Sequence, residues 1–233
     1  MGEPSGSPIK KRIMVRAITT IVCSLLLLLS FSCSREDTGP QETIPGSGIV
    51  TFTAMTGQGE TRSSQEGSFE TGDAIGVFAI EPKTGVYWAV NNKYTYDGQK
   101  FKPEAEADNI IVTVGTDFDF YVYYPFKTGQ TDITGISHTA GNQNEKAGWI
   151  SADFMTATYT DPIRDYTVPL NFKHRMSTVE VRIDRNDGVR EATMENVKRT
   201  SRFNLLTGGI STDESKGNCT MYKYSDFNSI RYN

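Results

Sequence analysis

The sequence has few of the side chains that build catalytic and metal sites. Its 233 residues include three cysteines and two histidines. Cys23 lies within an apolar leader and Cys33 follows that leader directly, so Cys219 is the one cysteine left for the folded part. A single cysteine forms neither an intramolecular disulfide nor a paired-cysteine zinc site. We therefore expect Cys219 to be a small, buried, apolar residue.

The two histidines give no further support for catalysis. We expect His138 in a polar loop and His174 on the apolar face of a strand, where a lone histidine is usually hydrogen-bonded and structural. No Ser-His-Asp or Cys-His set can be assembled around either residue with local support. The sequence therefore predicts a protein that is not an enzyme and that holds no metal ion or cofactor.

Helical periodicity and net positive charge are also lacking. Apolar residues alternate in short segments between Gly/Asp turns and do not recur at helical spacing, which predicts an all-β sandwich. Removal of residues 1–32 takes four basic residues and one acidic residue from totals of 24 and 28, which leaves an excess of seven acidic residues. This charge argues against binding to nucleic acid and against electrostatic binding to anionic lipid.

Residues 1–32 have the organisation of a bacterial signal peptide. Basic residues precede an apolar run of roughly 15 residues, which is too short to span a bilayer. Cys33 follows this run and a pair of small residues, as in a lipobox, where the peptidase cuts before a cysteine that is then acylated. An ordinary signal peptide cut after Ser32 or Ser34 is the alternative. We interpret Cys33 as the lipidation site.

Residues 33–48 are interpreted as an acylated tether. The Ser-Arg-Glu-Asp sequence after Cys33 resembles the acidic tag that directs some Gram-negative lipoproteins to the outer face of the outer membrane. The rest of this segment is rich in Gly, Pro, Thr and acidic residues, which is typical of a flexible linker. We therefore expect a lipid-anchored, surface-exposed protein of the cell outer membrane. Both Met1 and Met14 fit as the start of the chain.

The segment Ile49–Ala54 is predicted to be the first strand of the folded part. Its apolar face consists of Val50, Phe52 and Ala54, and threonines lie on the other face. The next segment, Thr56–Ser68, is a polar loop without large apolar side chains. It contains Arg62, where a trypsin-like protease can cut, since loop tips are the preferred places for cleavage. A solvated surface arginine without a role is the alternative.

Two later segments predict strands with a defined orientation. The residues from Phe118 to Phe126 alternate, and the face predicted to be buried consists of Phe118, Phe120, Val122, Tyr124 and Phe126. The opposite face consists of Asp119, Tyr121 and Tyr123. Tyr94–Tyr96 and Lys100–Phe101 flank a short turn at Asp97-Gly98, which predicts a hairpin, and Asp-Gly favours the type I′ geometry.

The segment Thr167–Ile183 changes the phase of its alternation. Apolar residues hold even positions from Leu170 to Met176 and odd positions from Val179 to Ile183, so the face expected to be buried swaps. A bulge, or a strand that crosses from one domain to the next, accounts for such a change. We therefore divide the folded part into a complete N-terminal β-sandwich, residues 49–168, and a partial C-terminal β domain, residues 169–233.

Several segments, taken in their order, resemble the fimbrillin (Mfa-like) lipoproteins of Gram-negative anaerobes. They are Cys33 with its leader, Phe69–Phe78, Lys93–Gly98, Phe120–Phe126 and Asn171–Ser177. The resemblance covers residues 33–210. It implies transthyretin-like β-sandwiches and a role in adhesion as a pilus shaft, tip or anchor subunit, with other fimbrial subunits as partners.

The resemblance also implies a way of assembly. In the shaft subunits of this family a protease cuts after an arginine near the first strand, that strand leaves, and a strand from a neighbouring subunit replaces it. Carried over by position, Arg62 would be the cut site. The exchangeable strand would include Ile49, Val50, Phe52 and Ala54. Arg35 is a rival site, but a cut there would release the lipid and keep the strand.

A glycan-binding surface lipoprotein of the outer membrane is the alternative function. Such proteins also combine β-sandwiches with a lipid anchor, and exposed aromatic side chains mark their binding sites. Trp88 and Trp149 lie in polar sequence contexts. This alternative therefore predicts that the two tryptophans lie together on an exposed face.

The lipid assignment leads to the first testable prediction. In a Gram-negative host, labelled palmitate should enter the wild-type chain and should not enter Cys33→Ala, because the variant lacks the thiol that is acylated. Cys23→Ala is the matched control and should label like the wild type, since Cys23 is removed with the leader. Equal labelling of the wild type and Cys33→Ala would show that the lipid is attached elsewhere.

Overall fold

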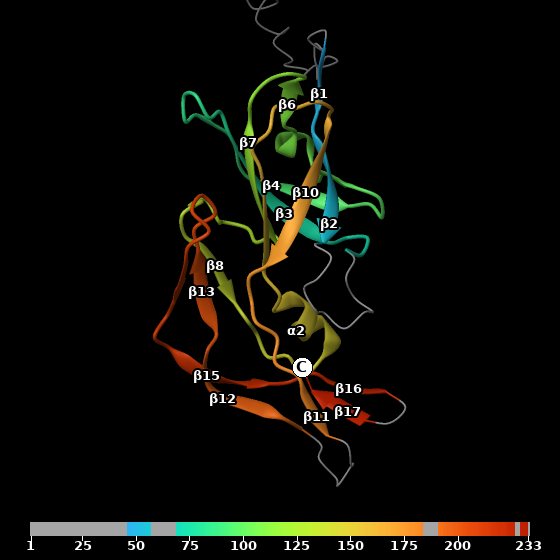
Figure 1. The fold of residues 1–233 in the computed structure, drawn as a ribbon, viewed down its shortest axis with the longest axis vertical. Coiled ribbons are helices and arrows are strands. Elements are labelled where there is room, and N and C mark those ends of the chain that lie inside the picture. Colours follow the sequence, from blue (N-terminus) through green and yellow to red (C-terminus); the bar gives the residue numbers. More distant parts are fainter. Residues whose placement is uncertain (1–45, 57–68, 184–190, 227–228, 233) are drawn as a thin grey trace, which may run out of the picture. The chain divides into compact units, whose positions relative to one another are not determined.

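Seven strands form the main sheet of the structure, a computed structural model that describes residues 46–56, 69–183, 191–226 and 229–232. The sheet closes into a barrel in the order β10-β2-β5-β4-β3-β7-β9 (Figure 1). The strands are β2 (Thr51–Thr56), β3 (Ala74–Ile80), β4 (Tyr87–Tyr96), β5 (Phe101–Pro103), β7 (Asp119–Tyr124), β9 (Met155–Tyr159) and β10 (Thr167–His174). The all-β prediction is confirmed. The expected transthyretin-like sandwich is not confirmed, because the ring of strands is closed.

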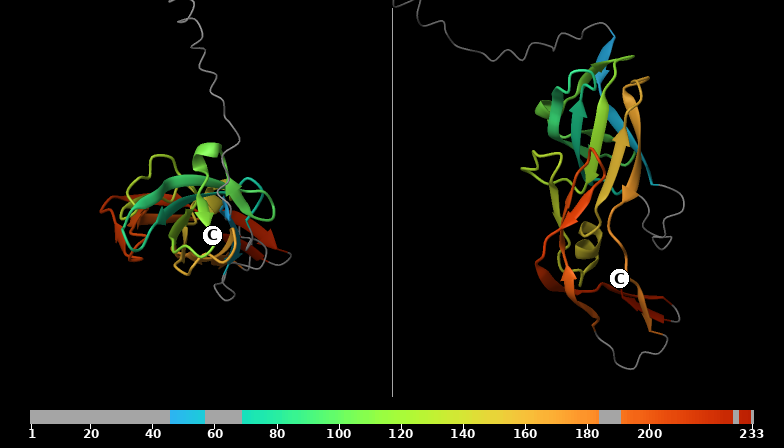
Figure 2. Two further views of the ribbon diagram at one scale, coloured as in Figure 1. Left: turned by 90° about the horizontal axis from the view of Figure 1, so that it is seen from above. Right: turned by 60° about the vertical axis from the view of Figure 1, so that its left-hand side comes forward.

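The first and last strands of the barrel pair in parallel. β2 lies beside β10 along its whole length, beginning at Thr51↔Thr167, and the two can be followed as the blue and orange strands of Figure 2. On its other side β2 meets β5 only at Phe52↔Phe101. Every other pair of neighbours in the barrel is antiparallel. β2 therefore depends on β10 for most of its contacts within the sheet.

The interior of the barrel is filled by the side chains that the alternation predicts. Phe118, Phe120, Val122 and Tyr124 are all buried in one hydrophobic cluster. Phe126, which was assigned to the same face, lies beyond the end of β7 and is partly exposed. Removal of this apolar surface from water is the main term that stabilises such a fold.

The outer face of the barrel is also covered where β3 and β7 lie. Phe78 of β3 and Tyr123 of β7 are fully buried in a second hydrophobic cluster. The Tyr123 ring stacks on Phe154, whose ring in turn lies 4.1 Å from that of Phe203. β3 is therefore buried on both faces. Tyr123 lies opposite the barrel core as predicted, but it is buried there by residues that come later in the chain.

Gly76 of β3 makes room for Tyr123 on this outer face. A Cβ atom at position 76 would lie 2.2 Å from the Tyr123 ring, so a larger residue would displace the ring. The Tyr123 hydroxyl is within hydrogen-bonding distance of Asn91 Oδ1 (2.7 Å) and of the Lys127 carbonyl (3.0 Å). Burial raises the pKa of Tyr123 to about 12, so the hydroxyl remains a donor at neutral pH.

A three-stranded sheet contributes Ile136 and Phe203 to the second cluster. It has the order β14-β13-β8 and contains β8 (Ile136–Thr139), β13 (Thr200–Phe203) and β14 (Ile210–Thr212). The polar loop predicted for His138 is wrong, because His138 lies on β8 and is buried together with Ile136. Its Nε2 lies 2.9 Å from the Ala152 carbonyl oxygen, and burial lowers its pKa.

The phase change in Thr167–Ile183 marks a chain that leaves the barrel. β10 ends at His174, past position 168 where we placed a domain boundary, and the next strand is β11 (Val181–Ile183). β11 belongs to the sheet β11-β17-β16, with β16 (Lys223–Asp226) and β17 (Ser229–Tyr232). A crossing between sheets therefore explains the change. The burial expected for Val179 and Val181 is wrong, because both side chains are exposed.

Two strand pairs and two short helices complete the described elements, and one of the pairs, β1 (Ser47–Ile49) with β6 (Ile111–Thr113), is part of the candidate site. β12 (Thr193–Lys198) pairs with β15 (Lys216–Thr220). The helices are α2 (Lys146–Ser151) and the 3₁₀-helix η1 (Glu106–Asp108), which the sequence did not predict because they are too short to show a period. In the described ranges, no helix combines the length and the apolar character needed to cross a membrane.

The predicted hairpin between β4 and β5 is present, but its turn is longer than predicted. The strands pair at Tyr96↔Phe101, so the loop has four residues instead of the two of a type I′ turn. Asp97 Oδ1 accepts the backbone N–H groups of Gln99 and Lys100 within this loop. The hydrogen bond from Lys102 and these two N–H groups hold the pKa of Asp97 well below its usual range.

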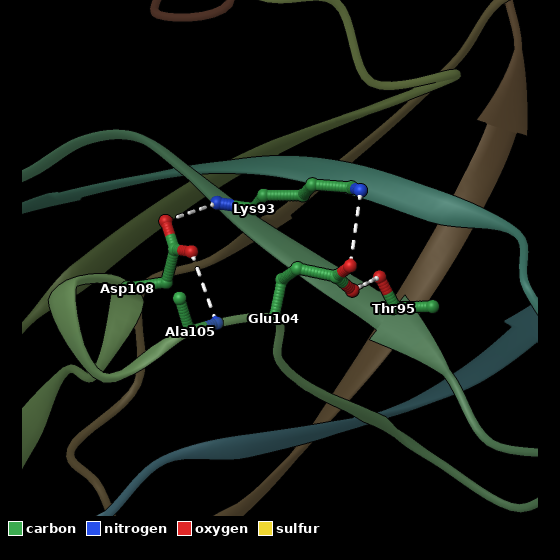
Figure 3. A network of polar contacts seen from close by, with 5 residues as sticks. All are labelled: Lys93, Thr95, Glu104, Ala105 and Asp108. Atoms are coloured by element: carbon green, nitrogen blue, oxygen red, sulfur yellow. Dashed lines mark hydrogen bonds and ion pairs between the residues drawn. The ribbon is translucent and has the colours of Figure 1, made fainter.

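A polar network fixes the chain between β5 and the next strand (Figure 3). Asp108 of η1 accepts the backbone N–H groups of Lys93 (2.8 Å) and Ala105 (3.2 Å). Glu104 forms an ion pair with Lys93 Nζ (3.4 Å) and accepts a hydrogen bond from the Thr95 hydroxyl. These contacts hold η1 against β4, and thereby position the start of β6 (Ile111–Thr113).

Phe120 offers a direct test of the barrel core. Phe120→Ala should lower the free energy of unfolding by about 3–5 kcal/mol, the range for truncation of a buried aromatic side chain. Thr158→Ala on the neighbouring β9 is the matched control and should change it by less than about 0.5 kcal/mol, since Thr158 is exposed. Urea unfolding measures both values. A loss of less than about 1 kcal/mol in Phe120→Ala would contradict the assigned core.

Candidate functional site

The candidate site is the N-terminal segment Gly46–Thr56 and the part of the barrel that receives it. The sequence predicted one strand over Ile49–Ala54, whereas the structure has two. The first is β1 (Ser47–Ile49), which pairs with β6 and begins within the segment interpreted as a tether. The second is β2, in the barrel. Val50 lies between them, where the chain passes from the small sheet into the large one.

The side chains predicted to face the core from this segment do so. Val50 and Phe52 have no exposed surface, and Ala54 packs against the same cluster. The Phe52 ring makes edge-to-face contacts with Tyr94 (5.0 Å) and Phe120 (5.3 Å). Such contacts stabilise aromatic pairs beyond the effect of their buried area. Phe52 is therefore the main apolar anchor of the segment.

Backbone hydrogen bonds hold the segment at the point where β1 becomes β2. The N–H of Val50 donates to the Ile110 carbonyl (2.9 Å), and the N–H of Thr51 donates to the Tyr166 carbonyl (2.7 Å). The Tyr166 hydroxyl donates to the Gly46 carbonyl (2.5 Å). The segment is thus attached both to the chain before β6 and to the chain before β10.

Tyr166 also covers Gly48, a contact that sequence reasoning missed. A Cβ atom at Gly48 would lie 2.8 Å from the Tyr166 ring, so the ring reaches its position only because residue 48 has no side chain. The sequence placed Gly48 in a flexible linker on composition alone. The one signal for a close contact was a glycine directly before an alternating segment. Such a glycine does not indicate which distant residue packs against it.

The other predicted site residues lie either outside the described residues or elsewhere in the fold. Cys33, Arg35 and Arg62 lie outside the described residues. Trp149 on α2 is 9% exposed and stacks on Tyr222, whereas Trp88 on β4 is 58% exposed. The pair of exposed tryptophans required by the glycan-binding alternative is therefore not present.

The few candidate ligands of the sequence have structural partners. His174 Nδ1 lies 2.9 Å from Asp153 Oδ2, so the hydrogen bond expected for His174 is present. Cys219 is buried, as predicted. Among the residues that the structure describes, no three His, Cys, Asp or Glu side chains gather in a way that could hold a metal ion.

Comparison with protein families identifies the class of this protein. The model of the fimbrillin-like family matches residues 61–230, which is more than half of the chain. The chain therefore belongs to the fimbrillin-like family, as the sequence resemblance indicated. No match was found among curated proteins.

Two solved structures have a similar fold. A candidate cell adhesion protein from Bacteroides ovatus superimposes with a TM-score of 0.58 at 18% identity, over 79% of this chain and 76% of that chain. A candidate cell adhesion protein from Bacteroides uniformis superimposes with a TM-score of 0.56 at 20% identity, over 82% and 75%. At these identities the likeness concerns the fold.

The contact of Gly48 with Tyr166 yields a test of how firmly the segment is held. Gly48→Ala should lower the free energy of unfolding by about 1–3 kcal/mol, as overpacking does, because the new methyl group collides with the ring. In a Tyr166→Ala background the same change should cost much less, since the obstacle is gone. Urea unfolding of the two single variants and the double variant measures the coupling. Strictly additive effects would contradict the contact.

Proposed function

We propose that this fimbrillin-like protein is a structural, non-enzymatic subunit of a surface fimbrium that joins its neighbours by β-strand addition. The position of β2 carries the proposal. β2 fills the barrel between β10 and β5, and the chain that connects it to β3 includes Arg62. While the chain between β2 and β3 is intact, β2 is covalently connected to the rest of the barrel. A cut in that chain would remove this connection.

Cleavage after Arg62 would change how β2 is held. The pairing with β10, the short contact with β5, the packing of Val50 and Phe52 and the attachment of β1 to β6 would keep it in place without a covalent connection to β3. Departure of β2 would open the barrel and expose the rings of Tyr94 and Phe120 to water. A strand from a neighbour with apolar residues at the same alternating positions would cover them again, and main-chain hydrogen bonds would join the subunits.

The proposed location follows from the leader. Acylation of Cys33 would attach the chain to the outer membrane. The residues after Cys33 would act as a tether between the membrane surface and the barrel. A cut after Arg35 would release the chain from its lipid but leave β2 in the barrel. A cut after Arg62 would separate the rest of the barrel from the lipid. It would also break the covalent connection between β2 and β3. The two cuts therefore have different consequences for assembly.

Limited proteolysis combined with peptide uptake tests the proposal. Limiting trypsin should cut the wild type after Arg62 and leave Arg62→Ala intact at this position. The cut wild type should then take up a biotin-labelled peptide with the sequence of residues 46–56, because that peptide restores the contacts of β2. Mass spectrometry locates the cut, and size-exclusion chromatography follows uptake and polymers.

A variant peptide supplies the matched control. The same peptide with Phe52→Ala lacks the main apolar anchor, so the cut protein should take it up far less well. If trypsin first cuts both chains elsewhere, or if the protein cut at Arg62 never takes up the wild-type peptide, this chain does not exchange its first strand.

A further inference from the structure

An exposed tryptophan stands on the barrel wall, away from the interior contacts of β2. Trp88 is 58% exposed although it lies on a barrel strand. Its ring makes an edge-to-face contact with Phe118, with centroids 5.1 Å apart and planes at 76°. Phe118 itself is buried in the barrel core. The indole is therefore supported on one side by a rigid residue and presents the rest of its surface to solvent.

Trp88 and Phe118 line a pocket of about 570 Å³, a volume within the usual range for small-molecule sites. Ile111 of β6 adds to the apolar part of its wall. The polar part includes the hydroxyl of Thr116 and the charged side chains of Glu81, Lys83 and Asp117. An aromatic surface edged by hydroxyl, carboxylate and ammonium groups combines apolar contact with directional hydrogen bonding.

Hydrogen bonds fix both walls of this pocket. On the β3–β4 side, the Glu81 N–H donates to the Val86 carbonyl (2.9 Å), and Glu81 Oε2 accepts the Thr84 hydroxyl (2.6 Å). On the other side, the N–H of Gly115 donates to the carbonyl of Ile163 (2.7 Å), and Ile163 is buried.

An ion pair between Lys83 Nζ and Asp117 Oδ2 (3.1 Å) joins the two sides. The pocket is therefore formed before any ligand arrives, which lowers the entropic cost of binding.

The charges of the pocket restrict its ligand. The described residues that line it include two carboxylates and one ammonium group, so an anionic ligand would meet net repulsion. A saccharide ring has a face of C–H groups, which packs on an indole, and a rim of hydroxyls, which carboxylate and hydroxyl side chains bind. We propose that this pocket binds a neutral saccharide, with Trp88 as the stacking surface and Asp117 as a hydrogen-bond acceptor. Ser47 of β1 also lines the pocket, so departure of residues 46–56 would remove part of its wall, but the stacking residue Trp88 lies on β4 and binding in the intact chain needs no strand exchange.

Tryptophan fluorescence gives a direct measurement of binding. In Trp149→Phe the exposed Trp88 is the single tryptophan. The purified full chain is titrated with neutral oligosaccharides of glucose, mannose, xylose, galactose and N-acetylglucosamine. At least one should shift the emission to shorter wavelength in a saturable way and protect Trp88 from acrylamide quenching, because the sugar covers the indole. An array of the same sugars serves to measure binding by chains that lack Trp88.

Matched variants distinguish binding at the pocket from nonspecific binding. Trp88→Ala should weaken the array signal about 10-fold or more, and Asp117→Asn should weaken it as well. Tyr87→Ala is the control, because Tyr87 precedes Trp88 on β4 and is 45% exposed but does not line the pocket. It should bind like the wild type. Thermal unfolding is measured for each variant, so that loss of binding in a folded chain is distinguished from loss of the fold.

Three results would overturn the proposal. The first is that no neutral oligosaccharide binds the wild type. The second is that binding persists undiminished in a folded Trp88→Ala chain. The third is that Trp88 instead supports self-association or capture of an apolar peptide, with no effect of sugar. None of these results bears on uptake of the β2 peptide, so failure here and failure of the proposed fimbrial role remain distinguishable.

Discussion

The parallel pairing of β2 with β10 is the contact on which the rest of the structure depends. Without this pairing, β2 would keep one residue pair with β5, and the barrel would be open between β2 and β10. The same pairing places Phe52 against Tyr94 and Phe120. The strand that closes the sheet therefore also fills the core. Because Tyr166 precedes β10 directly, its contacts with Gly46 and Gly48 extend this attachment to β1. The most N-terminal described segment is thus a structural part of the barrel.

Burial on both faces of β3 and β7 connects the barrel to the residues that follow it. The inner faces contribute to the barrel core, while Phe78 and Tyr123 point outward into a cluster completed by Phe154 and Phe203. Gly76 permits this arrangement because it leaves space for the Tyr123 ring. β13 pairs with β8, which lies more than 60 positions earlier in the chain, at Thr200↔Thr139. The later strands therefore depend on barrel residues for their core.

The sequence predicted what depends on local alternation and missed what depends on distant partners. The sequence assigned the correct face to Val50, Phe52, Phe120 and Val122. In a half-buried strand, apolar and polar residues alternate with a period of two, so the buried face can be read from the sequence. The closed ring, the burial of His138 and the contact of Tyr166 with Gly48 were missed, since each depends on residues far away in the sequence. The sequence also did not predict that Trp88 is exposed and Trp149 buried, because both residues have polar neighbours in the sequence. The resemblance of several ordered segments to a known family indicated the class of protein, but no sequence signal indicated the pocket.

The separation of β2 from β10 along the chain has a consequence for the order of folding. Thr51 and Thr167 are 116 residues apart, and their hydroxyls lie 3.2 Å from each other in the finished barrel. A chain that emerges from its N-terminus presents β2 first among the barrel strands and β10 last. Closing so long a loop is slow, because its entropic cost precedes the contacts that offset it. During that interval the nascent barrel has an unfilled edge, and β2 has only its short contact with β5. Closure of the barrel therefore waits for β10, the last of its strands to emerge.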